Sequence, residues 1–360
     1  MQPLVAFEGL HHSLQHCTRR TGHYLQHLPL YRVQQEIARF GVEITRKTLA
    51  DWVAATATAL EPLYHLVRDD LMAGSYLQVD ETPVQVMDPE VKGRTATGWL
   101  WVYARPGGGV IFDFQKGRGR DGPDQMLKSF AGTFQSDGYG LYESLERDRS
   151  DLRRVACWAH ARRKFHEAIP DDGPRSRGIM AMIAPLYGIE KVARESGLSS
   201  EARKELRQQH APAMLERLHR RLLELNPARV GSPVLPKSPL GKAIRYTLGQ
   251  WEALVRYLED GRYEIDTNLV ENAIRPSCVG KRNWLFIGHP DAGWRSAVIY
   301  SLSRTFATGH FESDKPQQKR GSQVKGLHYI GSVDRSACWV VILGRGCSGN
   351  TNRNRSISNL

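Results

Sequence analysis

The stretch Tyr76–Val84 constrains the fold more than any other part of this chain of 360 residues. Its valines favour a β-strand, and Pro83 confines that strand to an edge or a bulge because proline cannot donate a ladder hydrogen bond. Asp80 and Glu81 lie in the middle of this apolar run. A buried carboxylate needs a positive partner, either a divalent cation or an arginine, whereas an exposed carboxylate needs neither. The stretch alone leaves these three interpretations open.

Two further carboxylates favour the metal interpretation. Asp137 follows the apolar, strand-like run Gly132–Ser136, and Glu271 follows three residues that are all common helix N-caps. We therefore expect Glu271 in the first turns of a short helix, limited by Pro276. Two aspartates at the ends of adjacent strands and a glutamate from a crossing helix could hold two magnesium ions about 4 Å apart, as phosphoryl transfer requires.

The charge balance indicates a polyanionic partner. The chain has 50 Lys and Arg against 38 Asp and Glu, a formal net charge of +12. A basic protein whose candidate catalytic groups are acidic suggests nucleic acid handled through metal ions. We find no apolar run of roughly 18 residues and no signal-peptide pattern, so we expect a cytoplasmic, nucleoid-associated protein without a membrane partner. Five scattered cysteines without a CxxC pair indicate neither a disulfide framework nor a structural zinc site.

Residues 1–72 are predicted to be an N-terminal helical region. The pattern indicates a helix over Tyr31–Arg39 with Gly41 at its C-terminal cap, and Thr45 is suited to cap a second short helix. A separate helix is expected around Leu60–Leu71.

The first two of these helices resemble a helix-turn-helix motif. Arg46 and Lys47 begin the second helix, where contacts with DNA bases or phosphates usually fall. An ordinary helical hairpin with a solvated basic end explains the pattern equally well. Residues 1–22 are rich in histidine and are expected to be a solvated leader rather than a metal site.

Residues 73–169 are predicted to form the first part of an α/β core. After the strand with Asp80, the expected elements are strands over Gly98–Ala104 and Gly109–Phe114, a helix over Pro123–Phe130, the strand before Asp137, and Val155–Ala159 as a fifth strand or the start of a helix. The first three strands should form an antiparallel meander. This order is that of the ribonuclease-H-like fold, a mixed five-stranded sheet with flanking helices.

Residues 170–260 are predicted to be an α-helical insertion, followed by the last part of the core, residues 261–305, with Glu271. The expected helices are one capped at Ser199 or Ser200 and ending at Gln209, one over Pro212–Leu225, and one over Lys242–Asp260 with a core-facing apolar stripe.

Seven short segments of the sequence closely resemble segments of the transposase of the insertion sequence 66 family and occur in the same order. They are His27–Arg32, Asp80–Val86, Gly98–Tyr103, Ser136–Tyr139, Cys157–Phe165, Val270–Pro276 and Lys281–Phe286. The resemblance runs from about residue 24 to about Leu302, and chance matching of that many segments is negligible.

The resemblance implies a DDE transposase with a ribonuclease-H-like core and a helical insertion before its glutamate. Asp80, Asp137 and Glu271 match the catalytic acids of the family. Such acids bind two Mg²⁺ ions, for which Mn²⁺ can substitute, and these activate water and later a DNA 3′ hydroxyl to attack phosphodiester bonds. The implied partners are transposon-end and target DNA, further copies of the chain, and accessory proteins of the same element.

Several other polar residues in or near these matching segments have more than one interpretation. Glu81 should face the opposite side of the strand from Asp80 and be structural. Asp266 is either a fourth metal ligand or, by preference, a helix cap. Cys157 and His160 alone do not make a zinc site, and we expect a buried cysteine and a histidine near DNA.

The basic residues expected to contact DNA are Arg46, Lys47, Arg162, Arg163, Lys164, Arg275, Lys281 and Arg282. Because Arg162, Arg163 and Lys164 are consecutive, they cannot all face one way on a helix.

The sequence departs from the family pattern at both ends. Family members usually carry a cysteine-bearing, zinc-binding module before this region, and the residues from Ser303 onward have no family match. Residues 306–360 are expected to be a divergent, disordered tail that contributes nothing to the site. Two alternatives to an active transposase therefore stay open: an inactive, terminally altered DNA-binding remnant, and a nuclease that cuts without joining.

Overall fold

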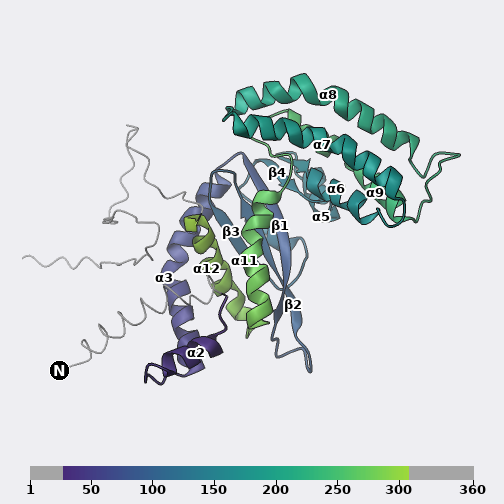
Figure 1. Ribbon diagram of the computed structural model, residues 1–360. Coiled ribbons are helices and arrows are strands. Elements are labelled where there is room, and N and C mark those ends of the chain that lie inside the picture. The colour runs from purple at the N-terminus through teal and green to yellow at the C-terminus, as the bar shows by residue number, and fades with distance from the viewer. Residues whose placement is uncertain (1–26, 308–360) are drawn as a thin grey trace, which may run out of the picture. The chain divides into compact units, whose positions relative to one another are not determined.

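The computed structural model describes residues 27–307, which all belong to one compact unit, His23–Gln317. The predicted leader and the tail from residue 308 lie outside the described residues. The unit is built on a five-stranded sheet in the order β3-β2-β1-β4-β5 (Figure 1). The strands are β1 Tyr76–Val86, β2 Ala96–Ala104, β3 Val110–Gln115, β4 Gly132–Ser136 and β5 Leu152–Ala156.

The sheet is mixed, and the predicted α/β class is confirmed. β1, β2 and β3 form the expected antiparallel meander, whereas β4 runs parallel to both β1 and β5. Both interpretations of Val155–Ala159 hold in part, because β5 ends at Ala156 and helix α6 (Trp158–Glu167) begins two residues later. Helix α5 (Gly140–Asp148), between β4 and β5, was not predicted.

The central strand β1 has different neighbours along its two halves. Tyr76–Gln78 pairs with β4, whereas the half that contains Pro83 pairs with β2 on one side and, on the other, only bridges Ile287 at its end. Pro83 therefore lies where one side of the strand has no strand partner, as its missing N–H requires. Helix α11 (Asn268–Trp284) closes this side, since Lys281 Nζ donates to the Thr82 hydroxyl and to the Pro83 carbonyl, both at 2.9 Å.

Alternate residues of the strands serve two separate cores. Leu77 and Val79 of β1 pack in a cluster with side chains of α3 (Arg46–Met72) and α5. Val84 and Val86 pack with α11 and α12 (Gly293–Ala307), which lie side by side in Figure 1. Because successive side chains of a strand point to opposite faces of the sheet, Asp80 lies on the face that α11 covers, and Glu81 lies on the face of α3 and α5.

The helical block has its own core. Its helices are α7 Gly173–Glu195, α8 Ser200–Glu224, α9 Pro239–Gly249 and α10 Trp251–Val255, followed by a 3₁₀ turn, Arg256–Leu258. Their apolar side chains share one cluster with Trp158, Ala161 and Phe165 of α6. The insertion therefore packs directly on the helix that follows β5.

Several predicted helix boundaries are wrong because the helices continue through proline. α3 is one helix of 27 residues with Pro62 inside it, so the predicted short second helix and the separate helix around Leu60–Leu71 are wrong, because they are one helix. α8 continues through Pro212 and α11 through Pro276. An interior proline costs about 3 kcal/mol, and buried side chains on both sides of each proline offset that cost.

Other boundaries follow the predicted signals. α2 spans Leu30–Ala38, and Gly41 adopts a positive φ of 77° beyond it. The Thr45 hydroxyl accepts the Thr48 amide at 3.1 Å, and Ser199 caps α8 in the same way. The predicted helix Lys242–Asp260 is instead divided at Gln250 into α9 and α10. Within residues 27–307, no helix has the length and apolar character needed to cross a bilayer.

Candidate functional site

The parallel pairing of β1 and β4 brings Asp80 and Asp137 to the same level. Gln78 of β1 pairs with Gln135 of β4. Each aspartate follows its glutamine by two residues, which puts Asp80 on the same face of β1 as Gln78, and the charge of Asp137 is near enough to raise the pKa of Asp80. Asp80 lies within β1, and Asp137 is the first residue after β4 ends at Ser136.

Helix α11 delivers Glu271 to this same face. Gln78 Nε2 donates to the Asp266 carbonyl at 2.9 Å, and Gln78 Oε1 accepts the Val270 amide at 3.3 Å. A buried side chain of the Asp80 strand therefore holds both the segment before α11 and its first turn. Glu271 lies in that first turn.

A second buried glutamine extends this attachment. Gln135 Nε2 donates to the Glu264 carbonyl at 2.8 Å, and Gln135 Oε1 accepts from the Tyr76 hydroxyl at 2.6 Å and from Gln78 Nε2 at 3.0 Å. Both glutamines are fully buried. They were not among the predicted site residues, although the repeated spacing of Gln and Asp on two strands was a usable signal.

The electrostatics of Asp80 reflect a cluster of acids. Burial raises the pKa of Asp80 to about 8, the negative charges of Glu81, Asp137 and Glu271 contribute to the increase, and a hydrogen bond from the Glu81 amide at 2.9 Å opposes it. Among residues 27–307, none of Asp80, Asp137 and Glu271 forms an ion pair with lysine or arginine. Glu271 lies 3.8 Å from His160 and accepts a hydrogen bond from the Thr267 hydroxyl at 3.3 Å. Within the described residues these carboxylates lack a lysine or arginine partner and are suited to hold a cation.

Glu81 lies on the opposite face and has such a partner. Its side chain is 2% exposed, pairs with Arg118 at 2.5 Å and accepts a hydrogen bond from Tyr142 at 2.5 Å. The Arg118 guanidinium lies over the rings of Trp99 and Tyr139. Arginine therefore compensates the charge of Glu81, which agrees with the expected structural role.

Asp266 is used at the start of α11. Its two carboxylate oxygens accept the backbone amide of Asn268 at 3.1 Å and the side-chain amide of Asn268 at 2.8 Å. Burial raises the pKa of Asp266. These contacts favour the interpretation of Asp266 as a residue that shapes the helix start.

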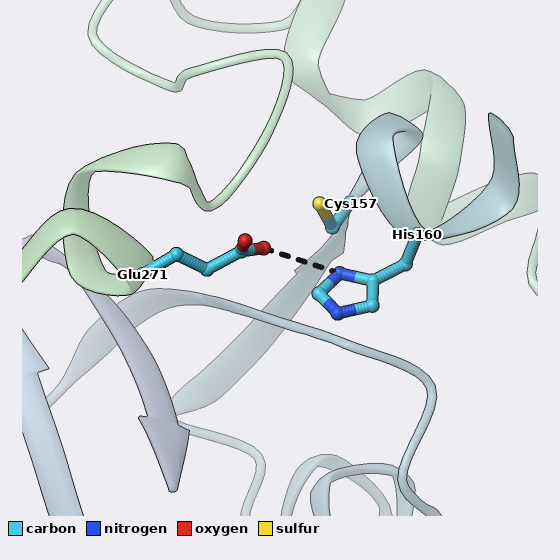
Figure 2. Close-up of side chains that lie close together, drawn as sticks. All are labelled: Cys157, His160 and Glu271. Carbon is cyan, nitrogen blue, oxygen red and sulfur yellow. Dashed lines mark ion pairs between the residues drawn. The ribbon is translucent and has the colours of Figure 1, made fainter. Parts of the chain in front are cut away.

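Cys157, His160 and Glu271 lie close together (Figure 2). One possible ligand atom from each lies within 4.8 Å of the others, and His160 Nδ1 is 3.8 Å from Glu271 Oε1. Cys157 is the buried N-cap residue of α6, and burial raises the pKa of its thiol to about 12. The proximity of Glu271 to the cysteine and histidine was not predicted.

Three predicted DNA-contacting residues follow one another on α6. Arg162, Arg163 and Lys164 are all exposed. Arg163 pairs with Glu167 at 2.9 Å, and Lys164 Nζ lies 5.1 Å from the centre of the Tyr246 ring. Their helix also carries His160 and begins directly after Cys157.

The other predicted DNA-contacting residues are dispersed. Arg46 and Lys47 are exposed at the start of α3, where Lys47 pairs with Asp51 at 2.8 Å. Arg275 and Arg282 are exposed on α11. Lys281 is half-buried because its ammonium binds β1 as described above.

Comparison with known proteins identifies one family. The family model described as "Transposase IS66 family" matches residues 20–295. The uncharacterized protein y4qI of Sinorhizobium fredii is 35% identical over 297 residues, which cover 78% of this chain and 54% of the relative. The uncharacterized protein y4jD of the same organism is 36% identical over 290 residues, with 77% and 55% covered. The chain spans about half the length of the curated relatives it matches.

Proposed function

Because this chain belongs to the IS66 family of transposases, we propose that it cuts and joins DNA strands at a metal-dependent site made of Asp80, Asp137 and Glu271. One observation carries the proposal. The parallel register pairs Gln78 with Gln135, two residues before Asp80 and Asp137, and the bonds of Gln78 hold the first turn of α11, which carries Glu271. This arrangement supports the assignment of the three acids to a DDE triad.

We also propose that the sheet is a ribonuclease-H-like core. Its order β3-β2-β1-β4-β5, with an antiparallel meander followed by two parallel strands, supports that assignment. The first aspartate then lies on the central strand, the second just after the neighbouring strand, and the glutamate on a helix that packs on β1 and β2.

The chemistry of the three acids fits magnesium, with manganese as a substitute. Magnesium takes oxygen ligands and needs few from the protein, and the three carboxylates have no lysine or arginine partner among the described residues. Bound magnesium would supply the positive charge that activates the attacking hydroxyl and stabilises the leaving oxygen. The chain's own residues position this charge: Asp80 and Asp137 from the sheet, and Glu271 from α11.

The proposed DNA path runs over α6. Arg162, Arg163 and Lys164 are exposed on the helix that also carries His160 and are suited to bind phosphate. Arg46 and Lys47 at the start of α3 would provide a second contact. Lys281 already makes two hydrogen bonds to β1, so we assign it to holding α11 in place.

The test is incubation of the full chain with magnesium and DNA that carries the ends of its own element, with both cleavage and joining scored. Changing Asp80, Asp137 or Glu271 to Ala should each abolish cleavage and leave DNA affinity largely intact. Asp291→Ala is the matched control, because the Asp291 side chain is 79% exposed. Near-normal cleavage by Glu271→Ala would remove that residue from the site.

The same assay distinguishes the alternatives. A native chain that binds the end DNA without cutting it is the inactive remnant. Cleavage without joining indicates a nuclease. Only cleavage and joining that both require the three acids support the transposase proposal.

A further inference from the structure

A second set of metal-binding groups lies beside the three carboxylates and shares Glu271 with them. It adds the Cys157 sulfur and the His160 imidazole, with one possible ligand atom per residue inside a span of 4.8 Å (Figure 2). Sulfur and imidazole are ligands for zinc and similar transition metals, whereas magnesium prefers oxygen. The two sets of ligands therefore differ in the cation they select.

His160 lacks the hydrogen bond that its buried nitrogen requires. In the described part of the chain, Nδ1 is buried without a hydrogen-bond partner, and its 3.8 Å distance from Glu271 Oε1 is too long for one. A buried polar atom without a partner carries a free-energy cost. A cation held between the imidazole and the carboxylate would satisfy both groups.

Two donors face the sulfur of Cys157, although burial without a cation keeps its thiol protonated. Its Sγ accepts the Thr267 backbone amide at 3.3 Å and the Thr267 hydroxyl at 3.2 Å. Cys157 is also the N-cap residue of α6, where the helix dipole favours an anion. Donors of this kind orient a metal-bound thiolate and stabilise its charge.

We propose that Cys157, His160 and Glu271 bind a zinc-class divalent cation. Binding forms one bond from each residue to the cation, and the Cys157 proton is released to solvent. In a tetrahedral zinc site the ligand atoms are about 3.5 Å apart. The three groups therefore need to approach one another by about 1 Å from their 4.8 Å span. The Glu271 side chain is 40% exposed and can make this adjustment.

This site goes beyond the proposed function, since cation binding requires no DNA chemistry. Its link to that function is Glu271, which cannot serve both cations fully. A zinc-class ion would draw this carboxylate away from Asp80 and Asp137. Inhibition of magnesium-dependent cleavage is the consequence, and this consequence alone rests on the proposed function.

The test uses cobalt(II) absorption by the full chain with Cys157 as its only thiol. The other cysteines, Cys17, Cys278, Cys338 and Cys347, are changed to Ser. One equivalent of cobalt should produce thiolate-to-cobalt charge-transfer absorption and tetrahedral d–d bands, and zinc should remove both. A further Cys157→Ser change should abolish the charge-transfer absorption.

His160→Asn and Glu271→Gln should each weaken cobalt binding by more than about 10-fold. His166→Asn is the matched control, because His166 is an exposed histidine on the same helix. Circular dichroism establishes that each variant is folded. No charge-transfer absorption in the folded single-thiol chain overturns the proposal, as does unchanged affinity in both His160→Asn and Glu271→Gln. These readouts are independent of strand cleavage, so the proposed function stands or falls separately.

Discussion

Replacing Asp80 by Asn should stabilise the metal-free protein, and the stabilisation should grow as the pH rises. Burial raises the pKa of Asp80 from its ordinary 3.8 to about 8. Between these two values the folded state binds more protons at this residue than the unfolded state does. The native protein therefore loses stability as the pH rises from about 4 to about 8. The asparagine variant has no such proton to lose.

The magnitude follows from the two pKa values. Between pH 5 and pH 7 an unfolded aspartate is mostly ionised, whereas folded Asp80 stays mostly protonated. Each pH unit in this window costs the native protein about 1.4 kcal/mol. The difference in unfolding free energy between variant and native protein should thus increase by about 2.5 kcal/mol from pH 5 to pH 7.

Urea denaturation in the presence of EDTA at pH 5, 6, 7 and 8 measures this difference. Asp121→Asn is the control, because Asp121 is exposed and has no ion-pair partner among the described residues, so its difference should not change with pH. If the unfolding free energies of native protein and Asp80→Asn change in parallel with pH, the reasoning is refuted, since Asp80 would then lie outside a buried cluster of acids.

Magnesium should reduce the difference in unfolding free energy between the native protein and Asp80→Asn. A cation at ten times its dissociation constant stabilises the folded native protein by about 1.4 kcal/mol. Asp80→Asn lacks one proposed ligand and should gain less. An equal gain in both proteins would contradict a role for Asp80 in binding the cation.

Two further predictions concern the support of the site and the DNA path. Gln135→Leu should lower the unfolding free energy, measured by urea denaturation, by about 2–4 kcal/mol. The reason is that the buried Glu264 carbonyl and Tyr76 hydroxyl lose Gln135 as their hydrogen-bond partner. An unchanged unfolding free energy would contradict the importance of this network. Changing Arg46 and Lys47 together to Ala should reduce the log–log salt dependence of DNA binding by about one unit per lost phosphate contact. An unchanged slope would make α2 and α3 an ordinary helical hairpin.

The strands were largely predictable because their signals are local. The bounds predicted for β4 match the structure, since Gly132 and Asp137 delimit its apolar run. The N-caps at Thr45 and Ser199 follow from side chains that accept a nearby amide. These features depend on residues within a few positions of one another.

The helix errors come from interactions that no local window contains. Pro62, Pro212 and Pro276 are strong local signals to end a helix. Each helix nevertheless continues, because buried side chains on both sides of the proline pack against elements distant in sequence. Propensity is a weak prior when tertiary packing opposes it.

The residues of the candidate site remain a prediction, and their geometry could not be predicted from the sequence. The family resemblance selected Asp80, Asp137 and Glu271, whereas the residues alone offered only three plausible acids among many. Their convergence depends on the register between β1 and β4 and on the attachment of α11. The role of Gln78 and Gln135 in holding the segment that leads into α11 can be recognised only when the register of β1 with β4 is known.

The helical insertion has a direct connection to the position of Glu271. Arg207 is fully buried, pairs with Glu190 at 2.7 Å, and donates to backbone carbonyls of Tyr257, Asp260 and Tyr263. Arg203 joins the same Glu190 to Glu264. The insertion thus holds the segment that leads into α11, while Gln135 holds Glu264 from the sheet side. Breaking a buried ion pair by removing one partner costs about 3–5 kcal/mol. We therefore interpret the insertion as part of the scaffold that positions the glutamate.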